Sequence, residues 1–167
     1  MITIRSAKRS DHDAIWAILE PVFRAGDTYA IDAGIGRADA LAYWCGPDQE
    51  TFVAEADGAV LGTYYMRPNQ RGGGRHVCNC GYVTARAAQG RGIARAMLEH
   101  SLGAAPRAGF RAMQYNFVVS TNSRAVALWR AYGFRIVGVI AQGFRHPEQG
   151  YVDAYVMYRA LNAPDPE

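Results

Sequence analysis

The sequence has few cysteines and no long apolar run. Cys45, Cys78 and Cys80 are an odd number and too few for a disulfide scaffold, which favours a reducing compartment. Nowhere do about 18 apolar residues follow one another, and the first residues carry no apolar run with a cleavage site. We therefore expect a soluble, cytoplasmic protein with no membrane partner.

The chain also lacks a cluster of basic residues. It has 18 Lys and Arg against 15 Asp and Glu, a net charge of only +3, and its basic residues are almost all arginines scattered along the chain. Because nucleic-acid-binding tails carry runs of basic residues, we expect no nucleic-acid partner. Scattered arginines favour contacts with anionic small molecules instead.

The length of 167 residues is enough for one domain with a real core and too short for two ordinary ones. Half of the residues are hydrophobic and 20% are charged, which is typical of a globular chain and not of a disordered or coiled-coil one. We find no internal repeat and no low-complexity linker. We expect one domain over residues 1–162 and a short C-terminal tail at 163–167.

Strand and helix patterns then alternate along the chain. Helical spacing of apolar residues occurs at about 10–23, 38–44, 94–102 and 123–132. Strand patterns occur at 2–5, 51–56, 60–66, 76–84, 112–119, 136–140 and 151–158. A hairpin meander followed by strand, helix, strand and helix predicts an α/β fold, a mixed sheet with helices on both faces.

The sharpest feature is Gln89-Gly-Arg-Gly-Ile-Ala94, which lies between a predicted strand and a predicted helix. Glycines at this place leave the first helical amides unpaired at the positive end of the helix dipole, where they can bind phosphate. A dinucleotide-binding loop would need a third glycine where the chain has Arg95, and a Walker loop would need Gly-Lys-Ser/Thr. A turn that serves only to start the helix is the alternative.

Two motifs make the chain similar to the GCN5-related N-acetyltransferase (GNAT) family. The acetyl-CoA loop of that family has the pattern Gln/Arg-x-x-Gly-x-Gly/Ala, which Gln89, Gly92 and Ala94 match. Its second signature is an asparagine that opens a helix ending before Gly-Phe, matched by Asn122 and by the segment 132–134. Both motifs occur in the family's order, and the flanking predicted elements also suit the family.

The resemblance implies a mostly antiparallel sheet of about seven strands with a splayed central parallel pair, and acetyl-CoA as the co-substrate. Backbone groups of Tyr82, Val83 and Thr84 would pair with the pantetheine arm. The pyrophosphate and the rest of the cofactor would contact Gln89, Gly90, Arg91, Gly92, Ile93, Ala94, Arg95, Asn122 and Trp129. For Asn122, a plain helix-capping role is the alternative.

The group that protonates the departing thiolate is not given by the family pattern. The family usually has a tyrosine seven residues after the asparagine, and this chain has Trp129 there. An indole N–H is a donor only and is no proton source near neutral pH. Tyr132, close to one helical turn further on, is the candidate substitute. The alternatives are a packing role for Tyr132 and protonation by water or by the proton of the amine itself.

Two asparagines lie in predicted strands, where asparagine is disfavoured. Together with Asn122 and Trp129, they make the chain look like the branch that includes the fungal proline-analogue (azetidine-2-carboxylate) acetyltransferases. In that branch, the asparagines that match Asn79 and Asn116 are implicated in holding the substrate and its nucleophilic nitrogen. The alternative is that both amides satisfy backbone groups where the strands diverge.

Three other features are weaker candidates. The alternating His76, Cys78 and Cys80 could bind a metal or present a thiol nucleophile at Cys80, and buried apolar cysteines are the alternative. No fourth ligand is evident, so we expect no metal. Glu55 could act as a remote base through water. Arg145, in an expected turn at 143–150, could pair with a substrate carboxylate; a solvated loop without that role is the alternative.

We therefore expect an acetyl-CoA-dependent N-acetyltransferase that uses direct attack in a ternary complex. The expected acceptor is a small amine, such as an amino acid or a proline-like imino acid. Protein N-terminal or lysine acetylation is one alternative, and a non-catalytic acyl-CoA-binding module is another, because Trp129 replaces the expected acid. The Tyr- and Val-rich final strands would also allow a homodimer.

Overall fold

The computed structural model describes residues 1–161, so the expected tail at 163–167 lies outside the described residues. In this part of the chain the α-helices are α1 (His12–Ala25), α2 (Arg37–Trp44), α3 (Ile93–Arg107) and α4 (Ser123–Ala131). The strands are β1 (Thr3–Ser6), β2 (Glu50–Ala56), β3 (Ala59–Pro68), β4 (Val77–Thr84), β5 (Ala112–Val119), β6 (Arg135–His146) and β7 (Gly150–Ala160).

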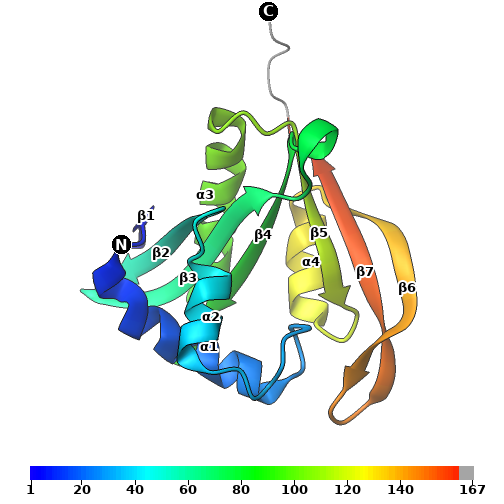
Figure 1. Cartoon of the computed structure of the whole chain (residues 1–167), viewed down its shortest axis with the longest axis horizontal. Helices are drawn as coiled ribbons and strands as arrows, with labels where there is room; N and C mark the ends of the chain where they lie inside the picture. The colour runs from blue at the N-terminus through cyan, green and yellow to red at the C-terminus, as the bar shows by residue number, and fades with distance from the viewer. Residues whose placement is uncertain (162–167) are drawn as a thin grey trace, which may run out of the picture.

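All seven strands form one sheet in the order β1-β2-β3-β4-β5-β7-β6. Every neighbouring pair is antiparallel except β4 and β5, which are parallel. Helices α1 and α2 cover one face of the sheet, and α3 and α4 cover the other (Figure 1). This arrangement confirms the predicted α/β fold with a mostly antiparallel sheet.

Each face of the sheet has its own hydrophobic core. Ile15 of α1 and Trp44 of α2 are fully buried on one side. Met97 and Leu98 of α3 are fully buried on the other. Helical spacing of the apolar residues therefore turns one stripe of each helix toward the sheet, as the sequence pattern predicted.

The central parallel pair separates soon after it forms. Only two residue pairs join β4 to β5, Val77 with Ala112 and Cys78 with Met113. Beyond them the two strands diverge, and Figure 1 shows them meeting at one end and spreading toward the other. The implied splayed pair is thus present, and it leaves one edge of β4 without a neighbouring strand.

The last hairpin differs from its predicted extent. Strand β6 continues to His146 and pairs with β7 through Arg145. The expected turn at 143–150 is therefore mostly strand, and Arg145 is exposed on it. Strand β6 is also the free edge of the sheet, where Val137 and Val139 are half exposed, at 51% and 56%.

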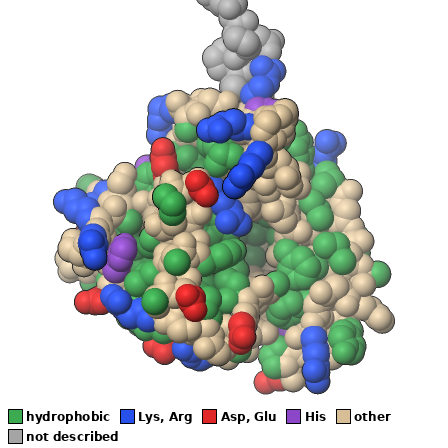
Figure 2. All heavy atoms as spheres, in the orientation of Figure 1, with side chains coloured by type: hydrophobic (Ala, Val, Ile, Leu, Met, Phe, Trp, Pro, Cys, Tyr) green, Lys and Arg blue, Asp and Glu red, His purple; other side chains and the backbone are tan. Residues whose placement is uncertain are grey.

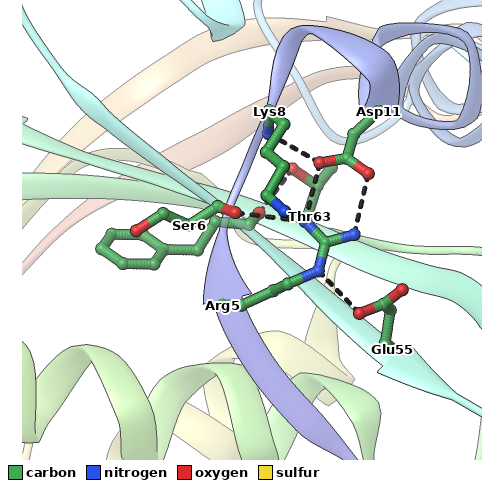
Figure 3. A network of polar contacts seen from close by, with 7 residues as sticks. Arg5, Ser6, Lys8, Asp11, Glu55 and Thr63 are labelled. Atoms are coloured by element: carbon green, nitrogen blue, oxygen red, sulfur yellow. Dashed lines mark hydrogen bonds and ion pairs between the residues drawn. The ribbon is translucent and has the colours of Figure 1, made fainter.

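An ion-pair network fastens the first strand to the start of α1 (Figure 3). Both terminal nitrogens of Arg5 donate to the Asp11 carboxylate at 2.8 Å, and Arg5 Nε donates to Glu55 Oε2 at 2.7 Å. The Lys8 amide also donates to Asp11. Because Arg5 binds both carboxylates, this network joins β1, β2 and the entry to α1.

The structure also bears on membrane and metal binding. Within residues 1–161, no helix is long and apolar enough to cross a bilayer. In the same range, no group of three or more His, Cys, Asp or Glu side chains is placed to hold a metal ion.

Candidate active site

A cavity of about 920 Å³ lies where β4 and β5 separate. The surface is hollowed between the part carrying α1 and α2 and the part carrying β6 and β7, with hydrophobic side chains on both sides of the hollow (Figure 2). The predicted site residues that line this cavity are Asn79, Tyr82, Val83, Thr84, Gln89, Gly90, Gly92, Ile93, Ala94, Arg95, Asn116, Asn122 and Trp129. Arg91 and Tyr132 are not among its lining residues.

The glycine loop has the geometry that an anion site needs. Gly90 and Gly92 have φ of +78° and +80°, a region that other residues rarely adopt, and no neighbouring atom lies within 4 Å of where a Cβ would be. Helix α3 begins directly after them. The amides of Gly90, Gly92, Ile93, Ala94 and Arg95 have no backbone acceptor within residues 1–161. These amides are free to bind an anion at the positive end of α3.

Arg91, unlike its neighbours in the glycine loop, does not have a free amide. Its amide donates to the Ala88 carbonyl at 3.3 Å, and its guanidinium pairs with the Asp57 carboxylate at 3.3 Å. Asp57 lies in the β2–β3 turn, a contact that sequence spacing could not reveal. The expected role of Arg91 at the pyrophosphate is therefore not supported by its position.

The open edge of β4 presents backbone groups of alternate residues. Antiparallel pairs alternate between hydrogen-bonded and non-bonded positions, and the bonds from Asn69 to Val77 and from Ala85 to Leu61 fix that alternation for β3 and β4. Odd-numbered residues of β4 thus point their backbone groups toward β3. The backbone groups of Tyr82 and of its even-numbered neighbours point toward the gap.

This alternation corrects one prediction. The backbone of Val83 belongs to the β3–β4 ladder, so it is not available to a pantetheine arm in the gap. The backbone groups of Tyr82 and Thr84 do face the gap. The Tyr82 carbonyl, however, accepts a hydrogen bond from the Tyr29 hydroxyl at 2.9 Å.

Asn122 is positioned to bind a ligand. It is the N-cap residue of α4, and its carbonyl accepts the first helical bond from Val126, but its side chain makes no capping hydrogen bond. The side chain has no hydrogen-bond partner within the described part of the chain, and the residue lines the cavity. The Asn122 side chain thus does not cap the helix in the described structure, and its role in ligand binding stays a prediction.

Tyr132 lies outside the cavity. At the end of α4 its hydroxyl donates to Glu99 of α3 at 2.5 Å, and this bond to a carboxylate raises the pKa of Tyr132. Trp129 does line the cavity and is 8% exposed, packed against the rings of Tyr82 and Tyr115. Tyr132 is thus poorly placed to replace the missing acid.

Asn79 bridges the point where the strands separate. Its Nδ2 donates to the Gln114 carbonyl of β5 at 3.0 Å, and its Oδ1 accepts a long hydrogen bond from Tyr65 at 3.4 Å. The residue is 6% exposed and lines the cavity. The amide therefore satisfies a backbone group at the divergence, one of the two roles considered for it.

Asn116 lies across the gap from Asn79 on β5. Residues 116 and 117 have no partner in β7, because the register shifts between Tyr115 and Val118. The Asn116 amide donates to Asn69 Oδ1 at 2.6 Å and accepts from Gln114 Nε2 at 3.0 Å. It is exposed and lines the cavity, so a ligand can reach it.

The remaining candidates do not take the roles that the sequence suggested for them. Cys80 lines the cavity, but burial raises the pKa of its thiol well above the usual value, so it stays protonated and is a poor nucleophile. Glu55 is held by Arg5 and does not line the cavity. Arg145 does not line it either.

Sequence reasoning missed the residues that form the wall under α1 and α2. Thr28 lies in the segment after α1, Tyr43 on α2, and Tyr65 and Arg67 on β3. The Thr28 hydroxyl is buried without a hydrogen-bond partner within residues 1–161. The Arg67 guanidinium lies over the rings of Tyr43 and Tyr65, at 5.6 and 5.0 Å from their centres. Only strand alternation hinted that Tyr65 and Arg67 share one face.

The fold and this site agree with a known family of enzymes. Residues 13–134 match the model of the acetyltransferase (GNAT) family, which covers most of the chain. The chain therefore belongs to the GNAT family of acetyltransferases.

The relatives of the chain are consistent with that assignment. N-acetyltransferase aca1 of Schizosaccharomyces pombe is 34% identical over 111 residues, which are 66% of this chain and 53% of that protein. The chain thus spans about half the length of this curated relative. A fungal N-acetyltransferase as relative supports the resemblance to the fungal branch.

Two solved structures share the fold. A GCN5-related N-acetyltransferase from Kribbella flavida is 42% identical with a TM-score of 0.91, over 96% of this chain and 98% of that one. The acetyltransferase yncA from Salmonella typhimurium, solved with its cofactor acetyl-CoA, is 22% identical with a TM-score of 0.86, over 100% and 98% of the two chains.

Proposed function

We propose that the protein transfers the acetyl group of acetyl-CoA to the amine of a small molecule by direct attack in a ternary complex. One observation carries this proposal. A single cavity runs from the free amides at the start of α3, through the gap between β4 and β5, to a polar wall under α1 and α2. Both substrates of an acetyl transfer can therefore meet inside it.

The residues of one half of the cavity fit acetyl-CoA. The free amides of Gly90 and of residues 92–95 suit a pyrophosphate, and Arg95 and Arg124 add positive charge to the lining. The open edge of β4 offers backbone groups for the amides of a pantetheine arm, in the manner of an added strand. When bound, acetyl-CoA supplies an activated thioester.

The chain positions the reaction more than it takes part in it. Holding the amine beside the carbonyl carbon supplies proximity, and amides of the open β4 edge can donate to the carbonyl oxygen as negative charge develops on it. The cavity lining contains no Asp, Glu or His within the described residues. The acceptor ammonium therefore loses one proton to water before the attack. As the new C–N bond replaces the C–S bond of the thioester, a proton that remains on the attacking nitrogen passes to the departing CoA thiolate, directly or through water. Since the Cys80 thiol stays protonated, a direct attack is favoured over a thiol-bound acetyl group.

Three further expectations belong to this proposal. We infer that residues 1–162 form the acetyltransferase domain. The three free thiols suit a reducing compartment such as the cytoplasm. A homodimer through the exposed edge strand β6 would cover Val137 and Val139.

Two measurements test the proposal. Calorimetry with CoA should give saturable binding, and thiol release from acetyl-CoA should depend on an added amine. Binding without amine-dependent release would favour the acyl-CoA-binding module, which the position of Tyr132 outside the cavity keeps open as an alternative. Release with peptides but not with free amines would favour protein acetylation. No association with CoA would reject all three.

A further inference from the structure

We propose that Arg67 selects the acceptor of this enzyme by binding a carboxylate of the acceptor, so that a free acid is used in preference to its amide; this inference deepens the proposed function and rests on it. The wall under α1 and α2, with Thr28, Tyr43, Tyr65 and Arg67, is the acceptor half of the cavity. Arg67 has no carboxylate partner within residues 1–161. Among the described residues, the lining contains Arg67, Arg95 and Arg124 but no Asp or Glu. A cavity of this composition attracts an anionic group and repels a purely cationic amine.

The guanidinium of Arg67 is held in place by aromatic rings and not by a counter-ion. It lies 5.6 Å from the ring centre of Tyr43 and 5.0 Å from that of Tyr65. The two rings meet edge to face at 86°. Rings stabilise a cation without neutralising its charge, so the donor fork stays available to a ligand carboxylate.

The position of Arg67 also matches the length of an amino acid. Arg67 is the cross-strand partner of Asn79, so their Cβ atoms are about 5 Å apart. The Tyr65 hydroxyl, below the guanidinium, reaches Asn79 Oδ1 at 3.4 Å. In an α-amino acid the nitrogen is two bonds from the carboxyl carbon. Because the guanidinium lies over the Tyr65 ring, whose hydroxyl contacts Asn79, a carboxylate on Arg67 brings the nitrogen to the side of the cavity where Asn79 lies.

A second polar group on this side lacks a partner. The Thr28 hydroxyl is buried and without a hydrogen bond within the described residues, although it lines the cavity. An unsatisfied buried hydroxyl is costly, and a polar ligand would satisfy it. This supports a polar acceptor and argues against an apolar amine.

The test compares acids with their amides. Thiol release from acetyl-CoA is measured with L-proline and L-alanine, and with L-prolinamide and L-alaninamide, which also imitate a peptide N-terminus. Below the pKa of both ammonium groups, a larger fraction of the less basic amine of the amide is neutral and able to attack. In this pH range amine reactivity favours the amide, so a preference for the acid cannot come from it. We expect the wild type to prefer the acids about ten-fold or more in kcat/KM.

Substitution of Arg67 should remove that preference. In Arg67→Gln, kcat/KM for the acids should fall on the order of 10- to 100-fold, mainly through KM, while the value for the amides stays within about two-fold. Arg67→Lys keeps the positive charge but not the paired N–H donors of the guanidinium. Its kcat/KM for the acids should lie between the values for the wild type and for Arg67→Gln. The control is Arg135→Gln, because Arg135 also lies over a tyrosine ring, Tyr158, but does not line the cavity. It should keep the wild-type preference.

Three results would overturn the inference. They are equal use of acids and amides by the wild type, a parallel loss for acids and amides in Arg67→Gln, and loss of the preference in Arg135→Gln. If no amine releases thiol, the proposed function fails, and calorimetry of the same compounds with the CoA-saturated protein decides the inference alone. Acid binding that Arg67→Gln abolishes would support it, whereas equal or absent binding to the wild type would overturn it.

Discussion

The hydroxyl of Tyr29 donates a hydrogen bond to the Tyr82 carbonyl at 2.9 Å, across 53 positions of the chain. Tyr29 belongs to the segment between α1 and α2, and Tyr82 lies on the open edge of β4. This bond joins the cavity wall under α1 and α2 to β4, whose open edge faces the gap. The Tyr29 ring is also packed edge-on against Phe23 and Trp44.

Tyr29→Phe should therefore loosen the acceptor wall more than the cofactor site. The ring contacts remain, but the hydrogen bond is lost, which should lower the free energy of unfolding by about 1 kcal/mol. We expect KM for the acceptor to rise several-fold and the Kd for CoA to change by less than about two-fold. Steady-state kinetics and calorimetry measure these quantities. A larger change in the Kd for CoA than in KM would contradict this assignment.

Gly92→Ala should weaken cofactor binding by straining the loop. At φ +80° a Cβ is disfavoured by about 1 kcal/mol, even though no atom lies within 4 Å of its place. If the loop changes conformation to relieve that strain, the free amides no longer point toward the phosphates of CoA. We therefore expect the Kd for CoA to rise about ten-fold. Gly109→Ala is the control, since Gly109 has φ +89° and open space but lies after α3, away from the cavity. It should cost similar stability, seen in urea unfolding, with an unchanged Kd.

Asn79 and Asn116 should respond differently to alanine. Asn79→Ala removes a buried bridge between β4 and β5, so we expect a loss of about 1–3 kcal/mol in stability as well as lower activity. Asn116 is exposed, and Asn116→Ala should unfold like the wild type within about 0.5 kcal/mol. It should nevertheless lose most of its kcat while keeping its affinity for acetyl-CoA. Unchanged turnover of Asn116→Ala would reject its role at the substrate nitrogen.

Tyr132→Phe should leave the chemistry intact. Its hydroxyl contacts Glu99 outside the cavity, so we expect kcat within about two-fold of the wild type. Because the lining holds no Asp, Glu or His among residues 1–161, kcat/KM should rise with pH up to the pKa of the acceptor ammonium, and the midpoint of this rise should shift when the acceptor is changed. A ten-fold loss in Tyr132→Phe, or a midpoint that stays fixed for every acceptor, would restore a protein group to the proton transfer.

The Arg5–Asp11 pair should make stability depend on acid pH. The bond to Arg5 lowers the pKa of Asp11 from 3.8 to about 2, and the side chain is only 9% exposed. A folded-state pKa below the unfolded one adds stability that is complete above pH 3.8 and is lost as the pH falls toward 2. Asp11→Asn should thus cost about 2 kcal/mol at pH 7 and very little near pH 2.

The control for this pair is Asp13→Asn. Asp13 also bonds an arginine, Arg37, but its side chain is 92% exposed. Solvent screens such a pair, so its loss should change stability by less than about 0.5 kcal/mol at either pH. Equal losses in the free energy of unfolding for the two substitutions, measured with urea, would show that burial does not determine how much the Arg5–Asp11 pair stabilises the protein.

Local features of the sequence predicted the elements because the physics behind them is local. Alternation in β4, helical spacing in α3 and the β2–β3 turn at Asp57 and Gly58, both with positive φ, need only neighbouring residues. The same holds for Gly90 and Gly92, whose freedom to take positive φ opens the start of α3. The strand β6 was predicted too short because its partner β7 extends it beyond its own apolar pattern.

The sequence by itself determined the αβ order, the glycine loop and the family motifs, since each depends on residues a few positions apart. Only the tertiary structure decided which side chains share the cavity. Arg91 pairs with Asp57, and Tyr132 bonds to Glu99. The guanidinium of Arg67, on β3, lies over the ring of Tyr43, which belongs to helix α2. Such choices depend on strand register and helix rotation, which the packing of the whole sheet fixes and no short stretch of residues encodes.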